Sequence, residues 1–322
     1  MNVTVTPLGL GCAPLGNLYH AISDETATAT VERAWAEGIR YFDTAPHYGL
    51  GLSERRLGAA LAQYPRDEYV LSTKVGRILE PDPSGASRLD DQAFEVPAAC
   101  KRRWDFSRDG VLRSLEDSLE RLGLDRVDIA FVHDPDDHFE EAVQGALPAL
   151  AELRRQGVLK AVGVGMNQTP MLTEFIRKCD IDVIMMAGRY TLLDQPALDE
   201  LLPLCQERGV SVLAAGVFNG GILATATPGT KYDYSDAPAE LIAKAERIAA
   251  VCARHGVEMP EAALALPAAH PAVAAVVVGA HTAEQISANV ARLRVEVPAA
   301  LWAELIAEGL LRPDTVVEGV VP

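Results

Sequence analysis

Eight short, β-rich segments alternate with longer amphipathic segments along almost the whole chain, and this alternation strongly constrains the fold. The β-rich segments are residues 8–12, 38–43, 68–74, 127–133, 159–165, 183–187, 210–215 and 274–279. Several are apolar at nearly every position, which is typical of parallel strands buried on both faces. Eight alternating units favour an α/β fold that closes into a (β/α)8 TIM barrel over an open doubly wound sheet.

The segments between the predicted strands carry helix signals. Ser23 precedes two acids at the start of one segment, and residues 107–122 place leucines at helical spacing. Gly123, Gly157 and Gly209 each follow a segment of this kind, at the position where a left-handed cap residue ends a helix. The amphipathic segments are therefore predicted to be the helices of the barrel.

Two segments interrupt the alternation and predict long loops. Residues 76–106 contain several prolines and end in a basic and aromatic run, and residues 218–238 are rich in glycine. Both follow predicted strands, so in a barrel they lie on the face where active sites are built. No linker divides the chain, and we expect residues 1–322 to form a single domain that ends with a helix over residues 298–306.

Composition and charge limit the classes of partner. A hydrophobic content of 49% is ordinary for a globular protein, whereas a formal charge of −16 would repel nucleic acids and anionic membranes. The apolar stretch over residues 262–280 is interrupted by prolines and a histidine, which argues against a membrane span. We expect no partner from nucleic acid or membrane, and we infer no partner protein.

The use of cysteine indicates the compartment. The five cysteines are dispersed and never form a C-x-x-C pair, which argues against a disulfide framework and a structural zinc site. No basic segment followed by an apolar run opens the chain, so no secretory signal is expected. These features favour a cytoplasmic protein.

Four residues with complementary chemistry lie at or near the ends of predicted strands. They are Asp43, Tyr48, Lys74 and His133. A tyrosine hydroxyl normally titrates near pH ~10, so proton transfer near neutrality needs a neighbouring cation such as Lys74. Asp43 can hold that lysine, and His133 can hydrogen-bond a substrate oxygen. The sequence therefore predicts a catalytic proton-transfer site.

Further motifs surround these four residues in a characteristic order. They are Leu8-Gly-Leu-Gly11, Phe42-Asp-Thr-Ala-Pro-His-Tyr48-Gly, Ser72-Thr-Lys74, and residues 114–123, 128–133 and 157–164. With these motifs the chain resembles the aldo-keto reductase family over essentially its full length. The resemblance implies a barrel enzyme that binds a nicotinamide cofactor without the Rossmann glycine fingerprint, with Asp43, Tyr48, Lys74 and His133 as its catalytic tetrad.

The resemblance also implies which residues contact the cofactor. Family members carry a Ser-Asn pair after the fifth strand. Here Asn167 can keep the amide role, whereas Met166 cannot replace the serine hydroxyl. Arg189 stands where the family often has a glutamine before Tyr190, and Phe218 is the candidate to stack on the nicotinamide. The other candidates are Gly220, Gly279, His281, Gln285 and Asn289.

The adenosine end of this predicted site bears on the choice between NAD and NADP. NADP-preferring members tend to carry a lysine and an arginine where this chain has Gly279 and Gln285. A 2′-phosphate would then lack its cationic partners, so we expect NAD. NADP stays an alternative because His281, Arg292 or Arg294 can supply part of the missing charge.

Within the family, the resemblance is greatest to a branch of aldose 1-dehydrogenases acting on L-fucose, L-galactose and related sugars. It is carried by residues 105–110, 133–136, 165–168 and 189–194. We therefore expect oxidation of the C1 hemiacetal of an aldose to the lactone, with Tyr48 as general acid and base. The candidates for contact with the substrate are Tyr19, His47, Trp104 and Asp134.

Other functions stay open from the sequence. Inside the family they are a pyridoxal 4-dehydrogenase, which forms 4-pyridoxolactone, and a general aldehyde reductase. Outside it, residues 133–138 (His-Asp-Pro-Asp-Asp-His) suggest a metal-dependent barrel hydrolase, but the ligand spacing is poor and we expect no metal. A regulatory subunit that binds the cofactor without turnover is the last alternative.

Overall fold

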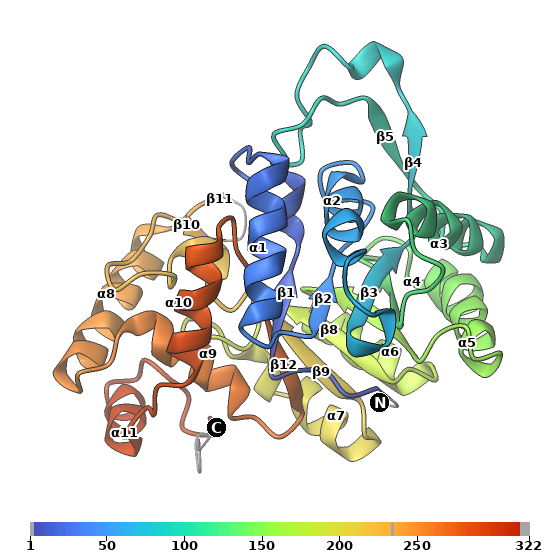
Figure 1. Ribbon diagram of the computed structural model, residues 1–322. Helices are drawn as coiled ribbons and strands as arrows, with labels where there is room; N and C mark the ends of the chain where they lie inside the picture. The colour runs from blue at the N-terminus through green and yellow to red at the C-terminus, as the bar shows by residue number, and fades with distance from the viewer. Residues whose placement is uncertain (1–2, 233–234, 316–322) are drawn as a thin grey trace.

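Eight parallel strands close into a barrel in the computed structural model, which describes residues 3–232 and 235–315 (Figure 1). Each strand pairs with the next one along the chain, and the last pairs with the first. The predicted (β/α)8 TIM barrel is therefore confirmed. Its strands are β1 Leu8–Gly11, β2 Tyr41–Asp43, β3 Val70–Val75, β6 Ile129–His133, β7 Ala161–Met166, β8 Val183–Ala187, β9 Ser211–Ala215 and β12 Val273–Gly279.

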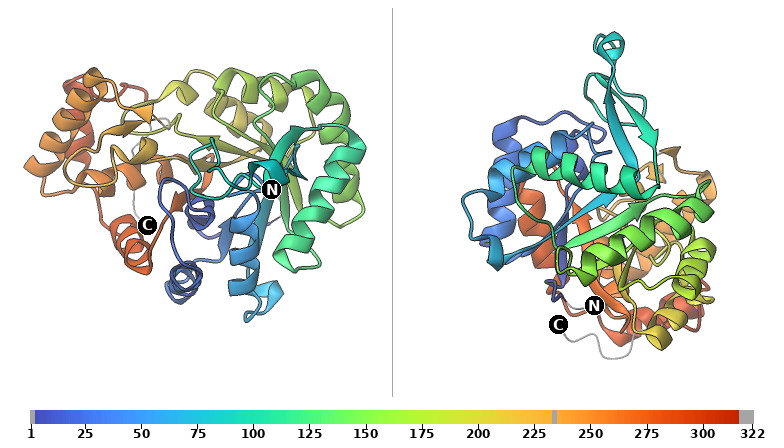
Figure 2. Two further views of the ribbon diagram at one scale, coloured as in Figure 1. Left: turned by 90° about the horizontal axis from the view of Figure 1, so that it is seen from above. Right: turned by 90° about the vertical axis from the view of Figure 1, so that its right-hand side faces the viewer.

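Helices lie between successive strands and surround the barrel (Figures 1 and 2). They are α1 Asp24–Ala36, α2 Leu52–Leu61, α3 Arg108–Leu122, α4 Phe139–Glu141, α5 Leu147–Arg155, α6 Thr169–Lys178, α7 Leu201–Arg208, α8 Ala239–Arg254, α9 Met259–Ala268, α10 Ala283–Leu293 and the C-terminal α11 Ala299–Ala307. A π-helical segment, Ala142–Ala146, joins α4 to α5, and single 3-10 turns cover Ala13–Gly16, Arg66–Glu68, Pro83–Gly85, Pro196–Leu198 and Asn219–Gly221. In the part of the chain that the structure describes, no helix combines the length and apolar character needed to cross a bilayer.

The predicted helix signals act as expected where the structure can test them. The Ser23 hydroxyl accepts a hydrogen bond from the Thr26 amide and caps α1. Gly123 and Gly209 end α3 and α7 in the left-handed conformation, with φ of 64° and 68°. Gly157, just beyond α5, has φ of 76°. Each glycine adopts a backbone conformation that a side chain would strain.

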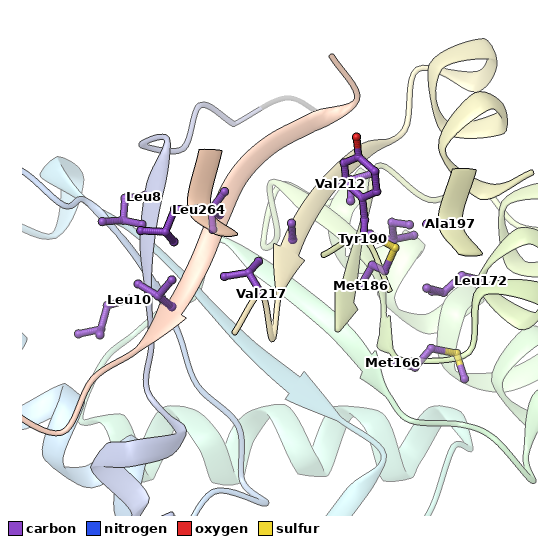
Figure 3. Close-up of a cluster of buried hydrophobic side chains, with 14 of the residues drawn as sticks. Leu8, Leu10, Met166, Leu172, Met186, Tyr190, Ala197, Val212, Val217 and Leu264 are labelled. Carbon is purple, nitrogen blue, oxygen red and sulfur yellow. The ribbon is translucent and has the colours of Figure 1, made fainter. Parts of the chain in front are cut away.

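Apolar side chains pack on both faces of the strands. Inside the barrel, Phe131 and Leu213 belong to one buried cluster. Outside it, strand residues pack with helix residues in a second cluster. Figure 3 shows Leu10 of β1 and Met186 of β8 in this cluster, together with Leu264 of α9. Burial on both faces explains the nearly continuous apolar runs by which the strands were predicted.

The two predicted long loops contain short strands. In the first, β4 Arg77–Pro81 and β5 Cys100–Trp104 form an antiparallel hairpin that projects beyond the end of the barrel (Figures 1 and 2). In the second, β10 Lys231–Tyr232 pairs with β11 Ser235–Asp236, and residues 233 and 234 lie outside the described residues. A two-stranded ribbon buries little apolar surface, so its sequence lacks the apolar run that identifies a barrel strand.

The connection between β4 and β5 packs back onto the barrel. Phe94 and Val96 form a small buried cluster with Leu50, against which Tyr48 also packs. The Glu95 amide donates to the Asn17 carbonyl at 2.9 Å, which joins this connection to the segment after β1. The first long loop therefore forms one wall beside the predicted catalytic tyrosine.

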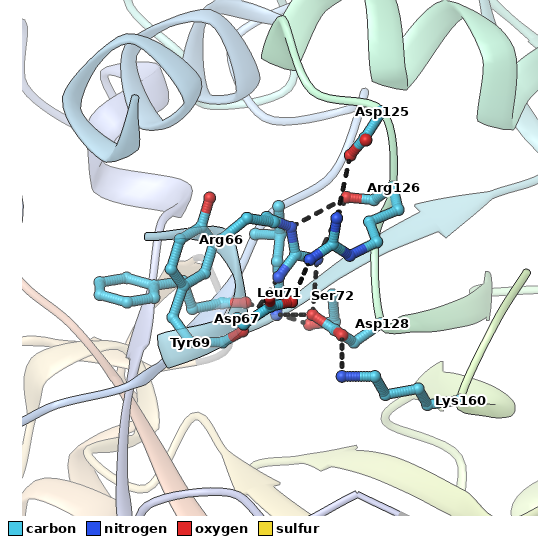
Figure 4. A network of polar contacts seen from close by, with 10 residues as sticks. Arg66, Asp67, Tyr69, Leu71, Ser72, Asp125, Arg126, Asp128 and Lys160 are labelled. Carbon is cyan, nitrogen blue, oxygen red and sulfur yellow. Dashed lines mark hydrogen bonds and ion pairs between the residues drawn. The ribbon is translucent and has the colours of Figure 1, made fainter. Parts of the chain in front are cut away.

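A buried carboxylate joins the segments that begin β3 and β6, at the end of the barrel where the strands start (Figure 4). Asp128 Oδ2 accepts from Arg66 Nη2 at 2.6 Å and from the Leu71 amide at 2.9 Å. Its other oxygen lies 2.8 Å from Lys160 Nζ. Asp128 is 1% exposed, and its network lies at the opposite end of the strands from Asp43 and His133.

Candidate active site

Three of the four predicted catalytic residues form a hydrogen-bonded chain at the C-terminal ends of β2 and β3. Lys74 Nζ donates to Asp43 Oδ2 at 2.6 Å and to the Tyr48 hydroxyl oxygen at 3.0 Å. It also donates to the Thr44 carbonyl at 3.2 Å, so its three protons have three acceptors. The fold therefore places an ammonium group in direct contact with both the phenol and the carboxylate.

Burial and pairing fix the charge of this lysine. Lys74 and Asp43 are each 2% exposed. Burial alone would lower the pKa of Lys74, but Asp43 and then Tyr48 outweigh that effect and raise it. Asp43 Oδ1 accepts from Ser72 Oγ at 2.7 Å, which orients the carboxylate toward the lysine. The result is a buried ion pair of defined orientation.

The loop that carries Tyr48 depends on a close approach between two glycines. Gly49 has φ of 61°, and a Cβ on it would lie 2.3 Å from the Gly16 carbonyl oxygen. A Cβ on Gly16 would lie 2.6 Å from the carbonyl carbon of Tyr48. Neither position accepts a side chain, so these glycines let the Tyr48 loop pack tightly against the turn after β1.

His133 ends β6 and lies beside Tyr48. The two rings are nearly perpendicular, at 89°, with centroids 6.0 Å apart. Burial, followed by the charges of Arg77 and Lys74, lowers the pKa of His133 well below its ordinary value. His133 is therefore a neutral imidazole near neutral pH. The structure thus brings all four predicted tetrad residues together.

Two arginines of the β4–β5 hairpin also reach this site, and the sequence interpretation assigned them no role. Arg77 pairs with Asp134, and its guanidinium carbon lies 4.4 Å from the centre of the Trp104 ring. Arg102 Nε donates to His47 Nδ1 at 2.6 Å. The run Lys101-Arg102-Arg103-Trp104 was visible in the sequence, but only the hairpin pairing shows which of its members face the site.

A cavity of about 950 Å³ extends toward α10 from residues next to the tetrad. The tetrad side chains themselves, and His47, which was also predicted to contact the substrate, are not among the residues on its wall. Arg77 and Asp134, next to His133, line one part of it, and the N-terminal turn of α10 lines another. Most of the predicted binding residues are on its wall: Tyr19, Trp104, Asp134, Asn167, Phe218, Gly220, Gly279, His281, Gln285 and Asn289. The volume is in the range of pockets that hold extended small molecules.

Arg189 and Tyr190, predicted to contact the cofactor, are not part of that wall. Arg189 Nε donates to the Asn167 carbonyl at 3.1 Å, behind the segment that faces the cavity. Tyr190 is 1% exposed, and its ring lies 5.5 Å from that of His270. Figure 3 shows Tyr190 among the buried core side chains. The structure places Arg189 as a support for Asn167 and Tyr190 in the core.

The α10 end of the cavity carries few cations. Gln285 Oε1 accepts from the His281 amide at 2.8 Å, and His281 Nε2 lies 2.8 Å from the Leu18 carbonyl. Arg292 lines the cavity and donates to Asn289 Oδ1 at 3.3 Å, whereas Arg294 lines a separate cavity of about 250 Å³. The acid Glu284 also faces the main cavity.

The two histidines that suggested a metal site are not arranged as ligands of one metal ion. His138 Nδ1 lies 3.0 Å from Glu141 Oε2, and its ring lies 5.8 Å from the Trp104 ring. His133 ends a strand beside Tyr48. Within residues 3–232 and 235–315, no group of three or more His, Cys, Asp or Glu side chains is arranged to hold a metal ion.

Comparisons with known proteins agree with this architecture. The model of the aldo/keto reductase family matches residues 7–307. D-threo-aldose 1-dehydrogenase from a Pseudomonas species is 48% identical over 316 residues, covering 97% of this chain and 96% of that protein. Pyridoxal 4-dehydrogenase from Microbacterium luteolum is 39% identical, covering 96% and 95%.

A solved structure gives the same result for the fold. An aldo-keto reductase from Bacillus halodurans, in its holo form, superposes with a TM-score of 0.75 at 27% identity, covering 99% of this chain and 97% of that one. The barrel and the family match, which covers nearly the whole chain, support the same conclusion. The chain belongs to the aldo/keto reductase family, whose members are oxidoreductases that use a nicotinamide cofactor.

Proposed function

We propose that this protein is an NAD-dependent aldose 1-dehydrogenase that oxidises the C1 hemiacetal of a sugar such as L-fucose or L-galactose to the lactone. One observation carries the proposal: Lys74 contacts both Asp43 and Tyr48 beside a cavity of about 950 Å³. The 48% identity to D-threo-aldose 1-dehydrogenase supports the substrate class.

Tyr48 acts as the base in the proposed reaction. The Lys74 ammonium, 3.0 Å away, stabilises the phenolate that accepts the proton of the hemiacetal hydroxyl. Asp43 keeps this ammonium charged and in place through the 2.6 Å ion pair. The neutral imidazole of His133 hydrogen-bonds the reacting oxygen and holds it against the tyrosine.

The cavity has groups suited to a nicotinamide dinucleotide. When bound, that cofactor accepts the hydride released from C1. Asn167 would hold the carboxamide, because this residue lines the cavity and its backbone carbonyl is held by Arg189. Phe218 supplies an aromatic face, and the N-terminus of α10 supplies backbone N–H groups for a phosphate.

The α10 end supports NAD over NADP. Gly279 and Gln285 carry no charge, and the Gln285 side chain is already engaged by the His281 amide. Glu284, on the same wall, would repel a 2′-phosphate and can accept a hydrogen bond from a ribose hydroxyl. Arg292, a cation at the α10 end of the cavity, would offer NADP some affinity.

An oxidation assay tests the proposal. NAD or NADP would be supplied at mildly alkaline pH with L-fucose, L-galactose, D-arabinose or pyridoxal. We expect NAD reduction with at least one sugar. Turnover of pyridoxal alone would identify a pyridoxal 4-dehydrogenase, which the 39% relative makes the second candidate. NADPH-dependent reduction of simple aldehydes, without oxidation of any of the four compounds, would identify a general aldehyde reductase.

The role of Tyr48 has its own test. Tyr48→Phe removes only the hydroxyl, so kcat should fall by ~10²–10⁴-fold while cofactor affinity is kept. Tyr64→Phe is a matched control, because Tyr64 stacks on Trp35 away from the site, with ring centroids 3.9 Å apart. Retention of more than about a hundredth of the turnover by Tyr48→Phe would show that another group moves the proton.

A further inference from the structure

Arg102 of the hairpin holds His47 at two points. Its Nε donates to His47 Nδ1 at 2.6 Å, and one terminal nitrogen donates to the His47 carbonyl at 3.2 Å. The terminal nitrogens also bind both oxygens of Asp90, at 2.7 and 2.8 Å. The Arg102 and Asp90 side chains are 12% and 3% exposed, so this is a buried two-point clamp with fixed geometry.

The clamp determines where the imidazole carries its proton. Every N–H of a guanidinium is a donor, and Arg102 cannot accept a hydrogen bond. His47 Nδ1 must therefore present its lone pair, which leaves the single proton of a neutral ring on Nε2. Burial, followed by the charges of Arg77, Arg102 and Lys74, lowers the pKa of His47 to about 2, so the ring stays neutral.

The surroundings of His47 place its ring beside the tetrad. The His47 ring centroid lies 5.7 Å from that of His133, 6.0 Å from that of Tyr48 and 5.2 Å from that of Phe94. The two nitrogens of an imidazole point in widely different directions, so Nε2 faces away from Arg102. The cationic groups that act on the ring are Lys74, Arg77 and Arg102, and the other titratable groups in ring contact are Tyr48 and His133.

We propose that His47 is a substrate-binding donor, and that Arg102 and Asp90 are positioning residues that fix its Nε2–H form toward an oxygen next to C1 of the sugar. This inference rests on the proposed function for the identity of the oxygen, which is the ring oxygen or the neighbouring hydroxyl. It gives the first long loop a role in substrate recognition. His47 and Arg102 then act as one unit, although the chain separates them by the whole of β3 and β4.

Nitrogen-15 NMR of histidine-labelled protein tests the proton position directly. Wild-type His47, assigned by comparison with His47→Asn, should show a protonated Nε2 and an unprotonated Nδ1 at every pH from ~5 to ~9. Arg102→Met should give a mixture of the two neutral tautomers, because burial, Arg77 and Lys74 still lower the pKa of the ring. Arg103→Met is the matched control, because Arg103 lies on the same strand but binds Glu80 at 2.6 Å and Asp105 at 2.8 Å.

Kinetics test the consequence for the substrate. Arg102→Met should raise KM for the sugar about tenfold, with a smaller change in kcat, because only part of the neutral rings then present Nε2–H. Arg102→Lys keeps one donor and should recover part of the loss. His47→Asn, which retains an N–H, should be less impaired than His47→Phe. Because Arg102→Met leaves Asp90 buried without its partner, the double variant with Asp90→Asn removes the stranded charge.

The outcomes separate this inference from the proposed function. A proton on His47 Nδ1 in the wild type, or an unchanged tautomer and KM in both Arg102 variants, would overturn the inference. The NMR measurement needs no substrate. A wild-type enzyme that oxidised no hemiacetal would therefore contradict only the proposed function, and the kinetic comparison would then use whichever carbonyl compound it does turn over.

Discussion

Lys74 is the residue on which the proposed proton transfer depends most, because it contacts both the phenol and the carboxylate. Lys74→Met removes the cation that stabilises the Tyr48 phenolate, so the hydroxyl should ionise less readily in the variant. We expect kcat/KM to fall at least a hundredfold near neutral pH and to recover partly as the pH rises. A pH–rate profile of kcat/KM for the wild type and the variant measures both effects.

Lys74→Met also leaves the buried Asp43 carboxylate without its ion-pair partner, so a second variant is needed. Asp43 would lose its 2.6 Å partner, so the double variant Asp43→Asn, Lys74→Met separates loss of catalysis from loss of folding. Circular dichroism would establish that the double variant is folded. A pH–rate profile with the wild-type apparent pKa would show that Lys74 does not tune the base.

The neutral side chain of Gln285 bears on the choice of cofactor. Gln285→Arg places a forked cation at the α10 end of the cavity, and we expect the ratio of kcat/KM with NADP to that with NAD to rise about tenfold. Gln285→Met is the control, because it also loses the hydrogen bond from the His281 amide but adds no charge. Equal ratios for the two variants would mean that the phosphate site lies elsewhere.

At the level of single residues, the sequence predicted the tetrad because its chemistry is carried by side chains at strand ends. Asp43, Lys74 and His133 end β2, β3 and β6, or nearly so, and a closed barrel brings such ends together. Arg77 and Arg102 could not be predicted in this way. Their place in the site depends on the pairing of Arg77 with Trp104 and of Arg102 with Leu79, which has no apolar pattern to mark it.

At the level of elements, the barrel strands were predictable and the hairpin was not. Val183–Ala187 is apolar throughout and matches its predicted bounds, whereas Arg77–Pro81 and Cys100–Trp104 were assigned to a loop. A barrel strand can be recognised in the sequence by apolar residues at nearly every position, because both of its faces are buried. The hairpin depends instead on contacts between distant parts of the chain, such as the cluster of Phe94 and Val96 with Leu50.

The Asp128 network is a place where a single substitution should lower the stability of the barrel. Asp128 joins Arg66, Lys160 and the Leu71 amide across the starts of β3 and β6 (Figure 4). Asp128→Asn keeps an acceptor for the amide but removes the charge, so we expect about 3 kcal/mol of lost stability. Denaturant unfolding measures it. Asp125→Asn is the control, because that side chain is 82% exposed and should change stability by less than about 0.5 kcal/mol.

At the level of the whole molecule, the two ends of the barrel serve different purposes. Asp128 and its partners lie where the strands begin, while the Asp43–Lys74 pair lies where they end. The Asp128 variant should therefore lower stability without changing kcat, and Tyr48→Phe should lower kcat without changing stability. This separation allows chemistry to be altered at one end while the other end keeps the fold.

Buried neutral histidines should make the whole fold sensitive to acid. The pKa of His47 is lowered to about 2 by burial, then Arg77 and Arg102, and that of His133 is also held well below its ordinary value. In the unfolded chain both titrate near ~6.5, so below that pH the unfolded state binds protons that the folded state does not. The free energy of unfolding should therefore fall between pH ~6.5 and ~5, above the range in which most carboxylates titrate.

Thermal unfolding measured across that range checks the expectation. His47→Asn and His133→Asn together should weaken the dependence of Tm on pH, because they remove two of the buried groups that take up protons on unfolding; burial also lowers the pKa of His270. His20→Asn is the control, since His20 is exposed. A wild-type Tm that stays constant from pH ~7 to ~5 would show that the two imidazoles are not held neutral. It would also remove the electrostatic basis for a fixed His47 donor beside the tetrad.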